Sequence, residues 1–130
     1  MTDIRALAQA ALDNALASDG VYSYWRRKAE AAGEDPDEYI VYTLDGDSAD
    51  AYADDEPYVR TANVAVRYYY RDLLLDTSAG RNTVKAREQV IAAALEQGGF
   101  SLPSGWFDVG DIDDIGFGCT LFEAFYGRVV

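Results

Sequence analysis

The stretch that most constrains the fold of this chain is residues 58–71, which read YVRTANVAVRYYYR. Apolar side chains occupy most of its even positions, whereas Thr61, Asn63, Arg67 and Arg71 stand at odd positions. Because side chains alternate between the two faces of a strand, this pattern predicts a long β-strand with one face toward a core and one toward water or a partner. The rest of the chain must then supply further strands and a covering layer.

Two segments carry the periodicity of amphipathic helices. Residues 4–16 place apolar side chains at the i, i+3, i+4, i+7 spacing, with Thr2 or Asp3 as the N-terminal cap and an expected end near Asp19-Gly20. A second helix is expected after a turn over residues 76–80. We expect it to begin near Asn82 or Thr83 and to end at a left-handed cap formed by Gly98-Gly99.

Four further segments have strand composition. Residues 21–25, 39–44, 106–109 and 116–126 are rich in aromatic and β-branched side chains. In the last of these both faces are largely apolar, so we expect helices to cover one face and a neighbouring subunit to cover the other. Residues 26–33 have helix-forming composition, and the acidic residues 34–38 and 45–57 are expected to be loops.

The order of these elements predicts one α+β domain over residues 1–130. We expect a mainly antiparallel sheet of four to five strands, with the two main helices packed on one face. A chain of 130 residues suits a single domain, and 49% hydrophobic residues can supply its core. The ten tyrosines fit strands and protein interfaces equally well.

Charge and composition exclude several classes of function. Eleven Lys and Arg against 23 Asp and Glu give a net charge of −12, which is opposite to what nucleic-acid binding requires. The chain has no histidine, so the usual base for a Ser or Cys nucleophile is missing, and we interpret Cys119 as a buried apolar residue. No signal peptide or membrane-spanning run is visible, so we expect a cytoplasmic origin.

The acidic segments invite two chemical hypotheses that the sequence does not favour. Asp45, Asp47 and Glu56 match positions 1, 3 and 12 of an EF-hand loop, but Ala49 and Asp50 stand where a ligand and a glycine are needed. The carboxylates at 108–114 resemble a solvated turn more than a glycosidase pair. We therefore expect no enzymatic activity, no metal site and no cofactor.

The arrangement as a whole resembles a known family. The N-terminal helix, residues 21–25 and 39–42, a polar loop containing Ala53-Asp54, the strand ending VAVRYYY, the helix and cap at 88–100 and a closing hairpin resemble the tail terminator, or tail completion, proteins of long-tailed bacteriophages and prophages. The resemblance covers nearly the whole chain but depends on hydrophobic patterns rather than on an invariant motif.

The resemblance implies a structural virion protein that is assembled in the host cytoplasm. Such subunits typically form a six-membered ring at the head-proximal end of the tail, where they cap the tail tube protein and meet the head connector or adaptor protein. DNA passes through the lumen of the ring without specific binding. An acidic subunit fits this role, since it would let the phosphate backbone pass without adhesion.

Two groups of residues are the candidate contacts of such a ring. We expect Arg60, Arg67, Tyr69 and Arg71, on or beside the long strand, to contribute to the subunit interface. The alternative for these arginines is ordinary surface pairing with the abundant carboxylates. We expect the loop that carries Asp45, Asp47, Asp50, Asp54, Asp55 and Glu56 to face the lumen or an adjacent ring.

Two other functions remain open. The chain fits another ring of the same junction, such as a head-completion or connector protein, equally well. It also has the size and charge of an acidic inhibitor that mimics DNA and occupies the basic groove of a host nuclease or regulator. Ring formation is expected for a junction protein and not for such an inhibitor.

Overall fold

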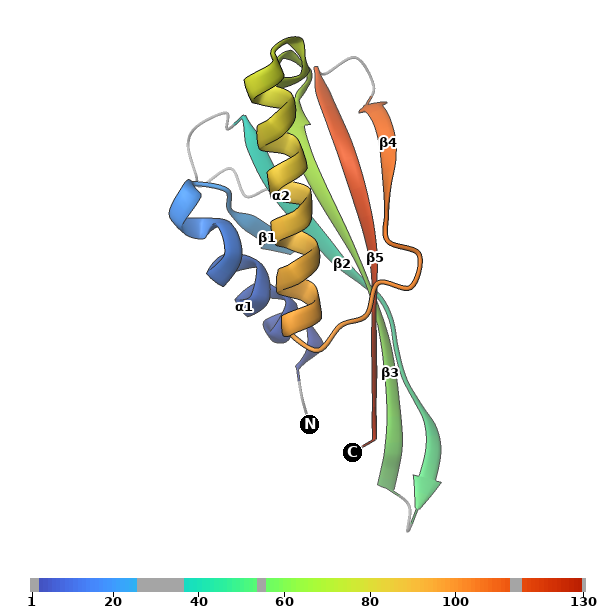
Figure 1. Cartoon of the computed structure of the whole chain (residues 1–130). Coiled ribbons are helices and arrows are strands. Elements are labelled where there is room, and N and C mark those ends of the chain that lie inside the picture. The colour runs from blue at the N-terminus through green and yellow to red at the C-terminus, as the bar shows by residue number, and fades with distance from the viewer. Residues whose placement is uncertain (1–2, 26–36, 54–55, 113–115, 130) are drawn as a thin grey trace.

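The computed structural model describes residues 3–25, 37–53, 56–112 and 116–129, with only the backbone described at 47–53, 56–60, 111–112 and 128–129. Two helices lie on one face of a five-stranded sheet (Figure 1). The elements in chain order are α1 (Ile4–Leu16), the 3-10 turn η1 (Ala17–Asp19), β1 (Ser23–Trp25), β2 (Glu38–Ala53), β3 (Glu56–Arg71), the 3-10 turn η3 (Asp72–Asp76), α2 (Ser78–Gln97), β4 (Trp106–Ile112) and β5 (Phe117–Val129).

The sheet has the order β1-β2-β3-β5-β4. The short edge strand β1 pairs with β2 in parallel, and all other pairs are antiparallel. The predicted α+β class, with helices on one face of a mainly antiparallel sheet, is therefore confirmed. The long strand predicted at 58–71 is the centre of the sheet, paired along most of its length with β2 on one side and β5 on the other.

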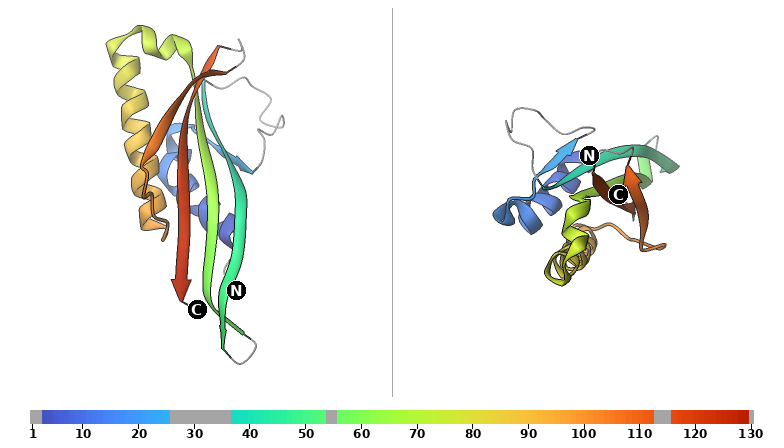
Figure 2. Two further views of the ribbon diagram at one scale, coloured as in Figure 1. Left: turned by 90° about the vertical axis from the view of Figure 1, so that its right-hand side faces the viewer. Right: turned by 90° about the horizontal axis from the view of Figure 1, so that it is seen from above.

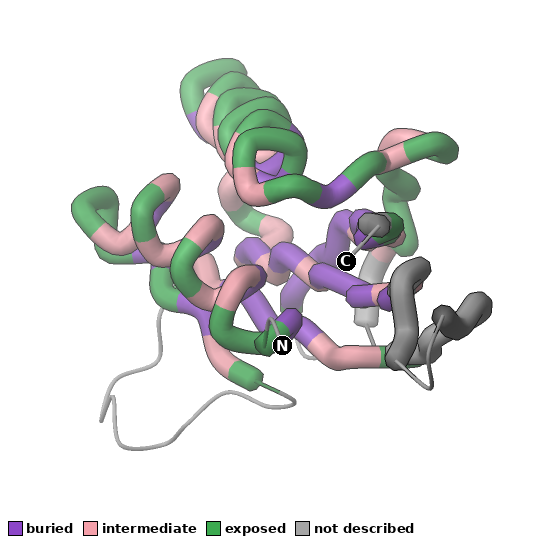
Figure 3. The backbone as a smooth tube through the Cα atoms, turned by 90° about the horizontal axis from the view of Figure 1, so that it is seen from below, coloured by how far each residue is buried: buried purple, intermediate pink, exposed green. Residues whose placement is uncertain are grey.

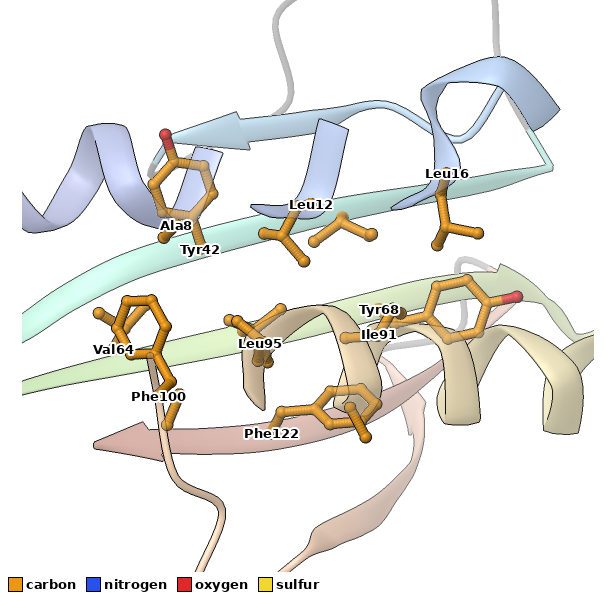
Figure 4. Packing of buried hydrophobic residues seen from close by; sticks show 14 of the residues in the cluster. Ala8, Leu12, Leu16, Tyr42, Val64, Tyr68, Ile91, Leu95, Phe100 and Phe122 are labelled. Carbon is orange, nitrogen blue, oxygen red and sulfur yellow. The ribbon is translucent and has the colours of Figure 1, made fainter. Parts of the chain in front are cut away.

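The core lies between the helices and the even-numbered side of β3 and β5. Figure 4 shows Leu12 and Leu16 of α1 and Leu95 of α2 packed over the sheet residues Tyr68 and Phe122. All five are fully buried. Figure 3 shows the same division, with buried positions along the strands and exposed positions on the outer sides of the helices. Truncating one of these leucines to alanine is expected to cost about 2–5 kcal/mol.

Local capping explains where the helices begin and end. Asp3 caps α1, since its Oδ1 accepts hydrogen bonds from the backbone N–H of Arg5 at 3.0 Å and Ala6 at 3.3 Å. At the end of α2, Gly99 has φ +98°, and the N–H of Phe100 donates to the carbonyl of Leu95. This is the left-handed cap that the Gly98-Gly99 pair predicts.

The start of α2 differs from the prediction. The helix begins at Ser78, not near Asn82 or Thr83, because Thr77 caps it by accepting the N–H of Gly80 at 3.0 Å. The expected turn at 76–80 is instead η3 followed by the first helical turn. Gly80 fits here because its missing side chain leaves room for η3: a Cβ would lie 1.8 Å from the carbonyl oxygen of Leu74.

The predicted loop at 45–57 is wrong for most of its length. β2 continues to Ala53 and β3 begins at Glu56, so this segment is the distal part of a long hairpin that projects beyond the helices (Figure 1). Three register irregularities between Leu44 and Tyr52 allow a polar sequence to stay paired with β3. The predicted helix at 26–33 and most of the loop at 34–38 lie outside the described residues.

A polar bridge ties α2 to the start of β2 and to η1. Arg87 Nε lies 3.1 Å from Glu38 Oε1, and Arg87 Nη1 lies 3.1 Å from Asp19 Oδ2. The Tyr68 hydroxyl donates to the same Glu38 oxygen. The Glu38 and Arg87 side chains are 15% and 21% exposed, so this pair is largely shielded from water.

Candidate functional site

The side of the sheet away from the helices carries the residues predicted to form an interface. We call it the helix-free face and define it by the odd-numbered residues of β3 and β5 and the residues that pair with them. No described helix covers it: Figure 1 shows both helices on one face of the sheet, and in the left view of Figure 2 α1 lies behind the strands and α2 beside them. On this face Arg67 pairs with Val41 and Leu121, and Tyr69 pairs with Tyr39 and Cys119.

One end of the helix-free face is an ordered aromatic cluster. Tyr39 stacks on Tyr69 with ring centroids 4.9 Å apart, and Phe117 meets Tyr39 edge-on at 5.7 Å. The Arg71 guanidinium lies 4.8 Å from the Phe117 ring, and its Nε donates to Asp37 Oδ1 at 2.8 Å. Arg71 is thus already bound within its own chain, which makes it a residue that orders the cluster.

Arg67 stands at the centre of the face. It is half-buried, and no described carboxylate lies within ion-pair distance of it. Burial raises the pKa of the adjacent Cys119 thiol to about 11, and the Arg67 guanidinium opposes that rise. Burial likewise raises the pKa of Tyr69. In a chain of net charge −12, a guanidinium that no described carboxylate pairs with is suited to bind an anionic group of another molecule.

Three of the four predicted interface residues therefore share one face. Arg67, Tyr69 and Arg71 lie together on the helix-free face, at successive odd positions of β3. Arg60 lies further along β3, where its backbone pairs with Arg128 in β5. Its side chain is outside the described part of the structure, so no contact is assigned to it.

The acidic residues predicted to face a lumen lie on the projecting hairpin. Asp45 is exposed and accepts the Thr43 hydroxyl at 2.9 Å. Asp47 and Asp50 lie along β2 and Glu56 opens β3, whereas Asp54 and Asp55 fall outside the described residues. The structure thus places four of the six on one rod-like element rather than on a loop.

Sequence reasoning missed a second surface, on the helical layer. A groove of about 450 Å³ runs between α1 and α2, lined by Leu7, Ala10, Ala11, Asn14, Ala15, Val90, Ala93, Ala94, Gln97 and Gly98. These residues fall between the core-facing and fully exposed sides of each helix. The sequence did contain a sign of this groove: alanines are in excess on the outward sides of both helices, where charged residues are more usual.

Two buried groups near the sheet centre, the Cys119 thiol and the Tyr68 hydroxyl, are held in their protonated forms. Cys119 is 1% exposed and its thiol stays protonated at neutral pH, since its pKa is about 11. Burial and the neighbouring Glu38 carboxylate raise the pKa of Tyr68, so its hydroxyl remains a hydrogen-bond donor. Across the ranges that the structure describes, no three Cys, Asp or Glu side chains are grouped to hold a metal ion.

Comparison with other proteins adds no assignment. No protein-family model matches the chain, and no curated protein matches it either. In the described part of the chain, neither helix has the length and apolar character needed to cross a membrane.

Proposed function

We propose that this chain is a ring-forming tail terminator at the head-proximal end of a phage or prophage tail. The proposal draws on the resemblance described above and on one structural observation: a broad sheet face with an aromatic cluster, exposed apolar side chains and a central arginine, which no described helix covers. Large apolar or aromatic patches of this kind are typical of protein interfaces. A second copy of the same chain would cover this face in a ring of six.

The proposed mechanism is capping by shape and charge, without catalysis. One side of the ring binds the last ring of tube protein, and the other side meets the head connector or adaptor and cannot template another tube ring. Arg67 and Tyr69 contribute to the contact between subunits, and Arg71 orders the aromatic cluster beside them. The assembly takes place in the bacterial cytoplasm and ends in the virion.

The acidic hairpin has a separate role in this proposal. Its carboxylates face the lumen or an adjacent ring, where their charge repels DNA phosphates and keeps the passing duplex from binding. Because both strands of the hairpin are continuous with the sheet, its position relative to the subunit interface is fixed by β2 and β3.

Native mass spectrometry over a range of concentrations tests ring formation. We expect a closed hexamer for the wild type and a shift toward monomers for Arg67→Glu. Lys85→Glu is the matched control, because it makes the same charge change at an exposed site on α2. A wild type that stays monomeric at every concentration would contradict a self-closing ring and would favour the acidic inhibitor.

A second measurement separates the terminator from the other rings of the junction. The purified chain is added to polymerising tail tube protein from the same phage, and tube length is measured by electron microscopy. A terminator shortens the tubes and is found at one end of each tube. A head-side adaptor forms rings but leaves tube length unchanged.

A further inference from the structure

The groove between α1 and α2 is uncharged and large enough for bulky apolar side chains. None of its described lining residues carries a charge, and its only polar side chains are the amides of Asn14 and Gln97. The helices approach closely at its floor, where a Cβ on Gly98 would lie 3.1 Å from the Cβ of Ala11. From Leu7 to Ala15 the groove is about 12 Å long, at 1.5 Å per residue.

The helix-free face carries an apolar ridge of matching length. Phe107 of β4 pairs with Leu121 of β5, and Phe125 lies four residues further on the same face. We call these three residues the apolar ridge. Phe107 and Phe125 are 43% and 38% exposed, which is unusual for aromatic side chains on a sheet. Leu121 and Phe125 are about 13 Å apart along the strand, close to the length of the groove.

Electrostatics decides which surface the ridge can meet. Copies with a net charge of −12 repel one another, so contact is favoured where it does not bring carboxylates of two copies together. One acidic side chain lies beside the ridge, the half-buried Glu123 between Leu121 and Phe125. Ridge against ridge would bring two Glu123 carboxylates together, whereas the groove offers the amide N–H donors of Asn14 and Gln97.

We propose that the apolar ridge of one copy binds in the α1–α2 groove of the next copy. This inference rests on the proposed ring function and names the two surfaces that meet in it. The groove is lined by α1 and α2, and the ridge residues lie on β4 and β5 at odd positions, away from the core. Figure 1 shows both helices on one face of the sheet and β4 at its edge. Two different surfaces on opposite sides of one subunit make a head-to-tail contact rather than a two-fold one, and such a contact forms a ring when the rotation between successive copies closes, as the proposed function requires.

Cross-linking between two variants that each add one exposed cysteine tests the pairing directly, because the native Cys119 is buried. Gly127→Cys adds a thiol beside the ridge, at an exposed position where a Cβ meets nothing within 4 Å. Ala10→Cys adds one at the exposed lip of the groove. With a short bifunctional maleimide, we expect covalent dimers only when the two variants are mixed. Dimers of Gly127→Cys alone would show ridge-to-ridge contact, and no dimers in the mixture would equally overturn the inference.

A charge placed in the groove gives a second, independent readout. Ala93→Glu adds a carboxylate at an exposed lining position, and Ala86→Glu adds the same group on α2 outside the groove. We expect Ala93→Glu to raise the concentration needed for half-assembly roughly tenfold or more, because the carboxylate loses water on contact. Ala86→Glu should leave it unchanged. If the wild type forms rings and Ala93→Glu assembles at the same concentration, this contact is refuted while the proposed ring function stands.

Discussion

Neutralising Glu38 should destabilise the fold much more than neutralising its neighbour Asp37. Both carboxylates bind an arginine, Glu38 through Arg87 at 3.1 Å and Asp37 through Arg71 at 2.8 Å. The two bridges differ in exposure, because the Glu38 side chain is 15% exposed and that of Asp37 is 66% exposed. Substitutions at these two adjacent residues therefore compare the loss of a shielded ion pair with the loss of a solvated one.

The expected magnitudes follow from that shielding. Removing one partner of a buried ion pair costs about 3–5 kcal/mol, because the other charge is left without compensation. In Glu38→Gln, Asp19 still balances part of the charge of Arg87, so we expect a loss of about 2–3 kcal/mol in the free energy of unfolding. Asp37→Asn removes a pair that water already screens, and we expect a loss below about 1 kcal/mol.

Urea unfolding followed by circular dichroism measures both variants. With a slope of about 2 kcal/mol per molar urea, Glu38→Gln should lower the midpoint by about 1 to 1.5 M and Asp37→Asn by less than about 0.5 M. Protein concentration must be held constant, since assembly would add to the apparent stability. Equal losses in the two variants would refute the reasoning. A second refuting result would come from the Arg87→Met variant, which has no guanidinium for Glu38 to balance. There Glu38→Gln should lose much less unfolding free energy, and a loss as large as in the wild type would contradict the reasoning.

Three other measurements test local features of the structure. Gly80→Ala should cost about 3 kcal/mol of unfolding free energy in thermal melts, because its Cβ would meet the Leu74 carbonyl, whereas Gly127→Ala should change it by less than about 0.5 kcal/mol. Cys119 should resist iodoacetamide at pH 8 and react fully in urea, as mass spectrometry will show; rapid labelling of the native protein would contradict its burial. Burial, with the Asp108 and Glu88 carboxylates, raises the pKa of Tyr70 to about 12. The protonated hydroxyl of Tyr70 therefore contributes its full share of the folding free energy below pH 10, and this share is lost as the pH rises from 10 to 12. Tyr70→Phe should therefore lose less stability across that range.

The helices and strands whose conformation is set by the periodicity of their own side chains were predictable from the sequence. The alternation at 58–71 marked β3, and the helical spacing at 4–16 marked α1, which ends at Leu16 and is followed by a 3-10 turn up to the predicted end near Asp19-Gly20. The distal half of β2 was not predictable, because Asp45, Gly46 and Asp47 have low strand propensity. Their extended conformation comes from pairing with β3, an interaction that no local window of sequence contains.

The candidate site was predictable only in part for the same reason. Alternation alone indicated that Arg67, Tyr69 and Arg71 share one side of a strand, and the structure confirms this. It could not indicate that Asp37, 34 residues away, binds Arg71. Nor could it bring two helices together to form a groove, since that depends on how α1 and α2 pack on the sheet.

The choice of which sheet face the helices cover follows from one central side chain. β5 has apolar residues on both faces, so its own sequence does not decide between them. On β3, however, the even side presents Val64, Val66 and Tyr68, and the odd side presents Arg67. A helical layer over the odd side would bury a guanidinium that has no described carboxylate partner, at a cost of several kcal/mol. The residue that keeps the helices off this face is thus the one whose charge reversal we expect to dissociate the ring.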